Sequence, residues 1–245
     1  TARVEELRAL CETLVDSVNA AYRESVGSED LGRPSAPQSM ASVDASIEEA
    51  YGVVATSGAF PEPWWGIRRG PAKPVRLLSS VMSRATISGV YCPFTGEANY
   101  NARVPVSHLP HTIAHEKAHQ RMVTSEDEAN FFGFLACAYS RDSYARYSGL
   151  LFAQRQLINQ LARFDIEGAK ALLKRRYSGV QRDVDAERAF WAQYQEGVLD
   201  RVSQKVNDTY LKVNGIREGT MSYGLSAELL ILFSRQNREV FAGKS

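Results

Sequence analysis

The chain has 245 residues, of which 44% are hydrophobic and 23% charged, and a net charge of +1. This ordinary globular composition allows one large domain or two small ones. The near-neutral charge gives no reason to expect a nucleic acid or an acidic membrane surface as a partner. Because no run of about 18 apolar residues is present, we expect no transmembrane span within the chain.

The N-terminal part is expected to hold two helices. Apolar residues recur close to every 3.6 positions over residues 4–22, which predicts an amphipathic helix, and a second helix is expected over 42–55. Residues 58–75 hold so many glycines and prolines that no regular element should persist there. Trp64 and Trp65 in this segment are expected to anchor the loop to the domain, with a hydrophobic lid or a membrane-facing edge as the alternatives.

Short segments rich in β-branched and aromatic residues predict three strands, over residues 75–81, 85–91 and 98–104. They would form a small antiparallel sheet. After Ser107 the chain should be nearly all helical, over residues 107–121, 125–140, 143–163, 166–176, 182–212 and 223–236. We therefore predict a mostly α-helical α+β fold in one domain, residues 1–245. Its parts are a helical N-terminal part with its loop (1–74), the sheet with two helices that would hold a metal (75–141) and a helical C-terminal part (142–245).

The most specific feature is the H-E-x-x-H sequence from His115 to His119. On a helix these two histidines lie on one face, one turn apart, so both imidazoles can bind a single zinc ion. Glu116 could then take a proton from the water that the zinc activates and pass it to a leaving amine. The pattern indicates metal-assisted hydrolysis, most simply of a peptide bond.

A catalytic zinc usually has a third protein ligand, for which Glu126 is the predicted residue. Ser125 should cap the following helix and form a capping box with Glu128. That leaves Glu126 free to face the metal, with Asn130 one turn later as a hydrogen-bond partner for a ligand. The alternative makes Glu128 the ligand and leaves Glu126 exposed.

Other polar residues have weaker signals. An oxyanion would need a further polar group, and the sequence does not decide between the candidates Tyr223, Tyr210, His108 and His111. The two histidines are otherwise expected to be structural or surface groups. The run Lys174-Arg175-Arg176 is expected to be a solvated helix end, where cations suit the helix dipole. Cys11, Cys92 and Cys137 are far apart in the sequence, and we expect free thiols, with one bridge from Cys92 to either of the others as the alternative.

Several segments together resemble the bacterial DUF3810 family, a family of unknown function regarded as related to zinc metallopeptidases. The segments occur in order: Pro93–Asn99, the H-E-x-x-H helix, Glu126–Phe131, Tyr210–Lys212 and Ser222–Gly224. Family members typically carry hydrophobic spans before this part. The resemblance therefore implies the soluble, extracytoplasmic portion of a bacterial membrane-anchored protein, and the first residue, Thr1 rather than Met, agrees with this.

The resemblance also bears on the site. The E-x-x-A-N sequence from Glu126 is similar to the E-x-x-A-D of membrane-associated gluzincins, in which the first glutamate binds the metal. The family usually has glycine three positions after the second histidine, where this chain has Met122. A tight turn there must be made without glycine, which puts the angle between the two helices in question.

The leading hypothesis is a zinc-dependent endopeptidase of the gluzincin type with a zincin-like core and one Zn²⁺. A peptide substrate would lie antiparallel along an edge strand, for which residues 98–104 are the candidate. The alternative is a non-catalytic zinc-binding sensor or interaction domain of a membrane-anchored protein, which a fourth protein ligand would favour, His111 being the nearest. A third possibility is a helical scaffold without metal.

Overall fold

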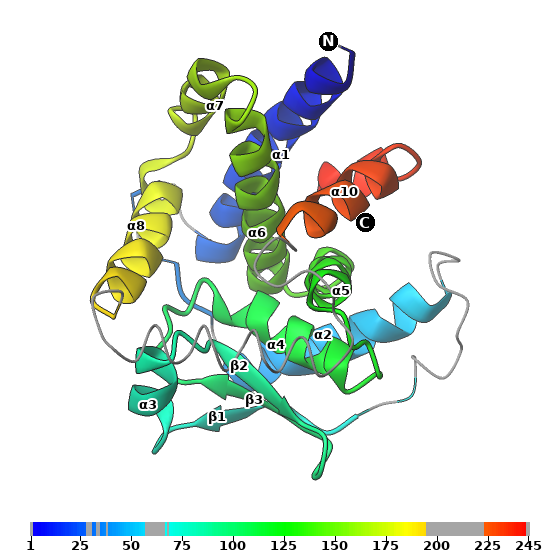
Figure 1. Cartoon of the computed structure of the whole chain (residues 1–245), viewed down its shortest axis with the longest axis vertical. Helices are drawn as coiled ribbons and strands as arrows, with labels where there is room; N and C mark the ends of the chain where they lie inside the picture. The colour runs from blue at the N-terminus through cyan, green and yellow to red at the C-terminus, as the bar shows by residue number, and fades with distance from the viewer. Residues whose placement is uncertain are drawn as a thin grey trace.

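The computed structural model of the chain describes residues 2–27, 31–32, 35–37, 39–56, 67, 69–194 and 223–243. A small sheet lies at one end of the molecule and a helical body is built on it, with the N-terminus at the opposite end (Figure 1). None of the helices in these residues is both long enough and apolar enough to cross a membrane.

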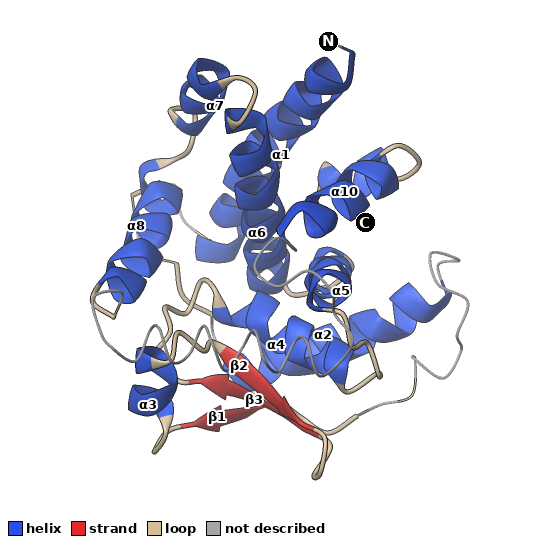
Figure 2. Ribbon diagram, viewed as in Figure 1, coloured by secondary structure: helices blue, strands red, loops and turns tan. Residues whose placement is uncertain are grey.

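The fold is α+β and mostly α-helical, as the sequence predicts (Figure 2). The elements in chain order are α1 (Ala2–Val26), α2 (Met40–Thr56), β1 (Lys73–Val75), α3 (Ser79–Arg84), β2 (Gly89–Cys92), β3 (Glu97–Asn101), α4 (Leu109–His119), α5 (Glu126–Ala138), α6 (Ser143–Ala162), α7 (Ile166–Leu173), α8 (Ser178–Ala192), α10 (Tyr223–Ser234) and α11 (Arg238–Phe241). The helix predicted over 182–212 corresponds in its first part to α8, which ends at Ala192. Residues 195–212, like Trp64 and Trp65, lie outside the described residues.

The sheet is mixed, not antiparallel as predicted. Its strand order is β1-β3-β2, with β1 parallel to β3 and β2 antiparallel to it. The strand predicted over 75–81 is wrong beyond Val75, because the chain turns and forms α3. Ser79 and Ser83, one helical turn apart, fasten α3 to the end of β3: Ser79 Oγ accepts the backbone N–H of Ala102, and Ser83 Oγ accepts the side-chain amide of Asn101.

The predicted edge strand is also wrong. β3 ends at Asn101 and lies in the centre of the sheet, so the candidate segment 98–104 has no free edge. β2 has a neighbour on one side only, and α4 packs across both β2 and β3. The free edge closest to the motif helix therefore belongs to β2.

The hydrophobic core lies where α1, α4, α5 and α6 pack together. Two glycines allow helices to approach closely: a Cβ on Gly149 of α6 would lie 2.4 Å from Cβ of Cys137 in α5, and one on Gly133 of α5 would lie 3.1 Å from the backbone nitrogen of His115 in α4. The tight contact between α5 and α4 fixes where α5 begins relative to the motif. All three cysteines are free, and Cys11 and Cys137 are buried.

A buried cluster of charged side chains ties α4 to α2. Lys117 Nζ lies 2.7 Å from Glu48 Oε2 and 3.2 Å from Asp44 Oδ1, and Arg121 Nη2 lies 2.7 Å from Glu48 Oε1. The side chains of Lys117 and Arg121 are fully buried, and the Arg121 guanidinium lies 4.0 Å from the centre of the Tyr51 ring. Because an unpaired buried charge is costly, this cluster fixes the rotation of α4 about its own axis.

Candidate metal centre

Helix α4 brings the two motif histidines together on one face. The His115 and His119 rings meet edge to face, with centroids 4.8 Å apart, and their Nε2 atoms are 3.1 Å apart. This is the spacing that residues i and i+4 of a helix predict. Both side chains are mostly buried, with exposed fractions of 13% and 14%.

Glu126 joins the histidines from the first turn of α5. Its Oε2 lies 3.1 Å from His115 Nε2, and its Oε1 lies 3.6 Å from His119 Nε2. Ser125 is the N-cap of this helix and accepts the backbone N–H of Glu128 at 3.4 Å. The Glu126 side chain is 38% exposed, so the cluster opens to solvent on that side.

The second nitrogen of each ring is held by an acceptor. His115 Nδ1 lies 3.0 Å from Asn130 Oδ1, and His119 Nδ1 lies 2.6 Å from the carbonyl oxygen of Val123. A carbonyl oxygen can only accept, so each Nδ1 carries a proton and donates it. In the neutral rings the Nε2 lone pairs then face one another and Glu126, which is how metal-binding histidines are oriented in proteins.

The turn after α4 places the Val123 carbonyl. Met122 has a positive φ of 63°, although it is not glycine. Its N–H donates to the carbonyl of His119 and the N–H of Val123 donates to that of Ala118, which together form a Schellman motif. An exposed methionine in the left-handed conformation therefore makes the tight turn that ends α4.

Glu116 lies beside the histidines and against β2. It is 6% exposed, and the backbone N–H of Tyr91 donates to its carboxylate. A Cβ on Gly89 would lie 2.5 Å from Glu116 Oε1, so any larger residue there would make this carboxylate move. Burial raises the pKa of the Glu116 carboxyl, and the charges of His115 and His119 partly offset that rise.

Charge is strongly coupled within the cluster. Burial lowers the pKa of His119, but the hydrogen bond with Glu126 and the charges of Glu116 and Glu126 outweigh burial and raise it to about 8. Burial would raise the pKa of Glu126, but hydrogen bonds with His115 and His119 outweigh it and hold the pKa well below its ordinary value. A carboxylate that faces two imidazoles is therefore ionised at neutral pH.

These donors suit a single zinc ion. The ligand atoms of His115, His119 and Glu126 all lie within 4.8 Å of one another. Tetrahedral zinc with Zn–N bonds of about 2.05 Å would separate two imidazole nitrogens by about 3.3 Å, close to the observed 3.1 Å. Two lone pairs directed at each other at that distance repel unless a proton or a cation lies between them. Within the part of the chain that the structure describes, no other group of three such side chains could hold a metal.

A family model described as a protein of unknown function (DUF3810) matches residues 1–231. The chain belongs to the DUF3810 family. No curated protein and no solved structure matches the chain.

The other acidic residues near the site of this DUF3810 protein point elsewhere. Glu128, the alternative ligand, is exposed and lies outside the cluster. Asp127 is buried and accepts the backbone N–H of Ser226 at 3.0 Å, which holds the beginning of α10 against α5. Of the three acidic residues that open α5, only Glu126 faces the histidines.

Of the four oxyanion candidates in this DUF3810 protein, the structure describes the side chains of the two histidines only. His111 Nε2 lies 3.1 Å from the carbonyl oxygen of Asn130, and its ring stacks on Phe152 with a centroid distance of 3.6 Å. His111 is not part of the group of side chains that could hold a metal, so the structure gives no support to it as a fourth ligand. His108 Nδ1 faces Glu187 at 3.4 Å. Tyr210 and the side chain of Tyr223 lie outside the described residues.

Three residues of the DUF3810 site were not found by sequence reasoning: Gly89, Tyr91 and Val123. Tyr91 and Val123 contribute backbone groups, which leave no signal in residue type. The Tyr91 ring also stacks near His119, with centroids 6.4 Å apart. Gly89 had a signal, because glycine within a predicted strand often marks the close approach of another group.

Proposed function

We propose that this DUF3810 protein is a zinc-dependent peptidase of the gluzincin type. The observation that carries the proposal is the meeting of His115 Nε2, His119 Nε2 and the Glu126 carboxylate, with both Nδ1 atoms already committed to acceptors. Two imidazoles and a carboxylate favour zinc among divalent ions. Three protein ligands leave a position open for water or substrate, which is the arrangement of catalytic rather than structural zinc.

In this proposal His115, His119 and Glu126 hold the metal, and Asn130 and the Val123 carbonyl keep the two rings in place. Zinc, when bound, supplies a Lewis acid that polarises the scissile carbonyl and lowers the pKa of water. The open side of the cluster, where Glu126 is partly exposed, is where the substrate carbonyl would approach.

Glu116 is the proposed proton carrier. It would accept a proton from the attacking water and donate it to the nitrogen of the leaving amine. Its position supports this role, because the carboxylate is buried between the histidine cluster and the edge of β2. The hydrogen bond from the Tyr91 N–H and the close approach of Gly89 hold the Glu116 carboxylate in one position.

The substrate would be an extended peptide that adds to the free edge of β2. Ser88 O accepts the N–H of Asn101 across the β2–β3 pair, so pairing alternates from there. The N–H and C=O of Gly89 and the C=O of Tyr91 then point to the free edge, and the Tyr91 N–H on the same side is the one that binds Glu116. This replaces residues 98–104 as the peptide-binding strand. We also predicted from the family resemblance that the protein is attached to a bacterial membrane by a segment that is not in this chain, with this domain outside the cytoplasm. Both stay predictions.

The test is hydrolysis of a mixture of internally quenched peptides by zinc-loaded protein, compared with Glu116→Gln. We expect the variant to keep its zinc and to lose activity by at least about a hundredfold, the usual contribution of a general base. Glu128→Gln, which removes an exposed carboxylate two residues after Glu126, is the matched control and should keep full activity. Full activity of Glu116→Gln would overturn the mechanism.

A further inference from the structure

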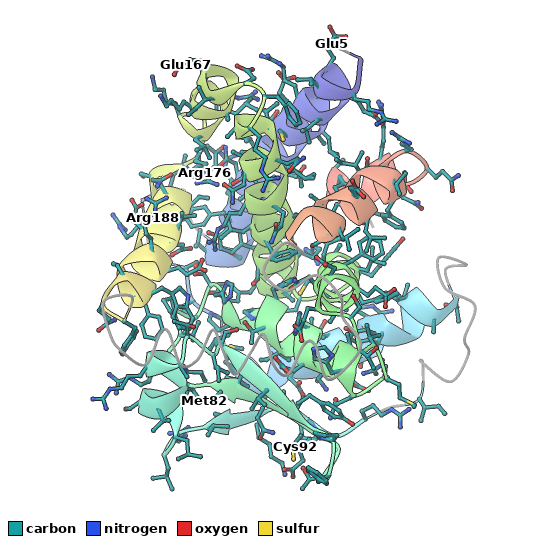
Figure 3. All side chains as sticks on the ribbon, in the orientation of Figure 1. Glu5, Met82, Cys92, Glu167, Arg176 and Arg188 are labelled. Atoms are coloured by element: carbon teal, nitrogen blue, oxygen red, sulfur yellow. The ribbon has the colours of Figure 1, made fainter. Side chains whose placement is uncertain are left out.

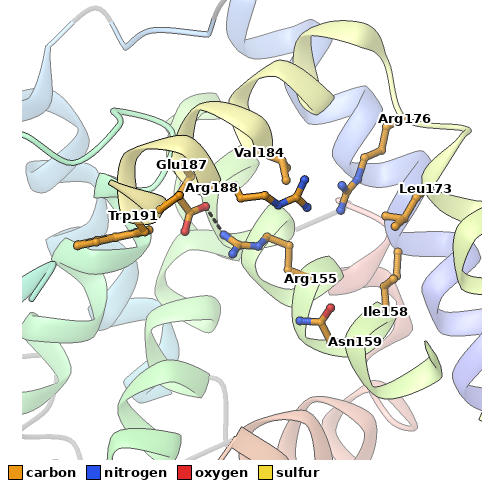
Figure 4. Close-up of a pocket in the computed structure, with 10 residues that line it drawn as sticks. Arg155, Ile158, Asn159, Leu173, Arg176, Val184, Glu187, Arg188 and Trp191 are labelled. Atoms are coloured by element: carbon orange, nitrogen blue, oxygen red, sulfur yellow. Dashed lines mark hydrogen bonds and ion pairs between the residues drawn. The ribbon is translucent and has the colours of Figure 1, made fainter. Parts of the chain in front are cut away.

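A cavity lined by none of the metal-cluster residues lies between α6, α8 and the turn that joins α7 to α8 (Figure 4). Its volume is about 300 Å³. Three arginines line it, Arg155 from α6, Arg176 from the turn and Arg188 from α8, together with a single carboxylate, Glu187. Figure 3 places Arg176 and Arg188 on the side of the molecule formed by α8.

The positive charge of this cavity is only partly matched. Arg155 forms an ion pair with Glu187, whose other oxygen faces His108 at 3.4 Å. Arg188 reaches Asp185 at 3.2 Å, but that pair is exposed and lies along one helix, where such pairs contribute little. The lining of the cavity thus holds three guanidinium groups and one carboxylate.

Arg176 has no acidic partner within ion-pair distance among the residues that the structure describes. Its Nε donates to Gln154 Oε1 at 2.7 Å and its Nη1 to Gln181 Oε1 at 3.3 Å, both neutral amides. Burial lowers the pKa of Arg176 to about 10, and the charges of Arg155 and Arg188 contribute to the shift. Two amides thus hold this guanidinium in place without neutralising it.

The residues that line the cavity indicate which kind of ligand would neutralise its positive charge. Guanidinium groups bind phosphate oxygens in pairs with matching geometry. Ile158 and Leu173 line the cavity at the end where Arg176 lies, and Trp191 lines it at the other end, beside Glu187 (Figure 4). The volume is at the lower end of the range for small-molecule sites and leaves room for more than a phosphate ion.

We propose that this cavity binds a small organic phosphate monoester, whose dianionic group lies between Arg176, Arg188 and Arg155 and whose carbon part contacts Trp191. The site is separate from the metal centre and does not depend on the proposed peptidase activity.

Phenyl phosphate is a suitable probe, because it joins a phosphate dianion to a ring that can contact Trp191. Isothermal titration should show one binding site per chain, with inorganic phosphate and the singly charged benzenesulfonate binding more weakly. Arg176→Gln and Arg188→Gln should each weaken phenyl phosphate binding at least about tenfold, as expected for the loss of a charge-assisted hydrogen bond. Lys174→Gln, which removes an exposed cation two residues from Arg176, should leave binding unchanged.

Arg188 is the safer position to substitute, because its side chain is 73% exposed and its loss should not disturb folding. The binding result for Arg176→Gln counts only if the thermal unfolding of this variant matches that of wild type. If wild type does not bind phenyl phosphate, or if Lys174→Gln weakens binding as much as Arg188→Gln, the cavity is not a phosphate site and the proposal is wrong.

Discussion

His119 Nδ1 lies 2.6 Å from the carbonyl oxygen of Val123, so the turn that ends α4 also orients a proposed metal ligand. The turn depends on Met122, whose φ of 63° is unfavourable for a side chain with a Cβ. The geometry of the metal centre and the strain of this turn are therefore linked.

Met122→Gly should stabilise the protein slightly, by about 0.5 kcal/mol. Relief of the left-handed conformation gains roughly 1–2 kcal/mol, and the greater freedom of glycine in the unfolded chain returns about 0.5–1 kcal/mol of it. Met122→Val should instead destabilise, because a β-branched residue at positive φ is strongly disfavoured, and should also weaken zinc binding through His119. Urea unfolding measures the change in stability, and zinc titration measures the change in zinc affinity. A Met122→Val protein with wild-type stability would show that the turn does not require this conformation.

Gly89→Ala should impair catalysis without removing the metal. The added Cβ would lie 2.5 Å from Glu116 Oε1 and 2.8 Å from Cγ2 of Thr112, so the carboxylate must move. We expect kcat to fall about tenfold to a hundredfold, since misplacement by about 1 Å is costly in catalysis, while zinc content stays at the wild-type level. Gly52→Ala is the control: nothing lies within 4 Å of its Cβ, and alanine within a helix should stabilise by about 0.5–1 kcal/mol. Unchanged kcat in Gly89→Ala would separate Glu116 from the chemistry.

Asn130→Ala should weaken zinc binding by about tenfold to a hundredfold, the usual effect of losing a group that holds a metal-binding histidine. Asn130 Oδ1 is the acceptor for His115 Nδ1, and without it the ring can rotate. Competition with a chelator of known affinity gives the zinc dissociation constants. Glu128→Gln should bind zinc as wild type does; a loss in that variant would favour Glu128 as the ligand in place of Glu126.

Stability should depend on pH through Glu48. Burial raises the pKa of this carboxyl, but the charges of Arg121 and Lys117 and their hydrogen bonds outweigh burial and lower it below the ordinary value of 4.5. A pKa lowered by folding means that this contribution is complete above pH 4.5 and is lost as pH falls below it toward the folded-state value.

Urea unfolding from pH 7 to 3 tests this dependence. The Glu48→Gln protein should lose about 3–5 kcal/mol at pH 7, because Lys117 and Arg121 stay buried with fewer partners, and should show a weaker loss of stability below pH 4.5. Equal slopes in the two proteins would place the acid sensitivity elsewhere.

The sequence was sufficient where one local pattern decided the structure. The spacing of His115 and His119 fixed their common face, and the small polar Ser125 before an acidic run predicted where α5 begins. Periodic apolar residues predicted the long helices for the same reason. The family resemblance rested on several such segments in order, and the family model covers them.

The parts that failed depend on contacts between distant segments. The β-branched residues of 75–81 predicted a strand, yet two serines hold residues 79–84 as a helix against the end of β3. Which strand lies at the edge of the sheet depends on how the strands pair, and no local sequence pattern indicates that pairing. Arg176 was expected to be solvated with Lys174 and Arg175; those two are exposed, but the turn before α8 directs Arg176 inward to Gln154.

The metal content of protein purified without added metal tests the central claim most directly, for wild type beside His119→Ala and Glu126→Ala. We predict about one zinc per chain in wild type and its loss in both variants, with folding checked by circular dichroism. Wild-type protein without bound metal, or metal that neither substitution removes, would contradict the three-ligand centre on which the proposed function rests.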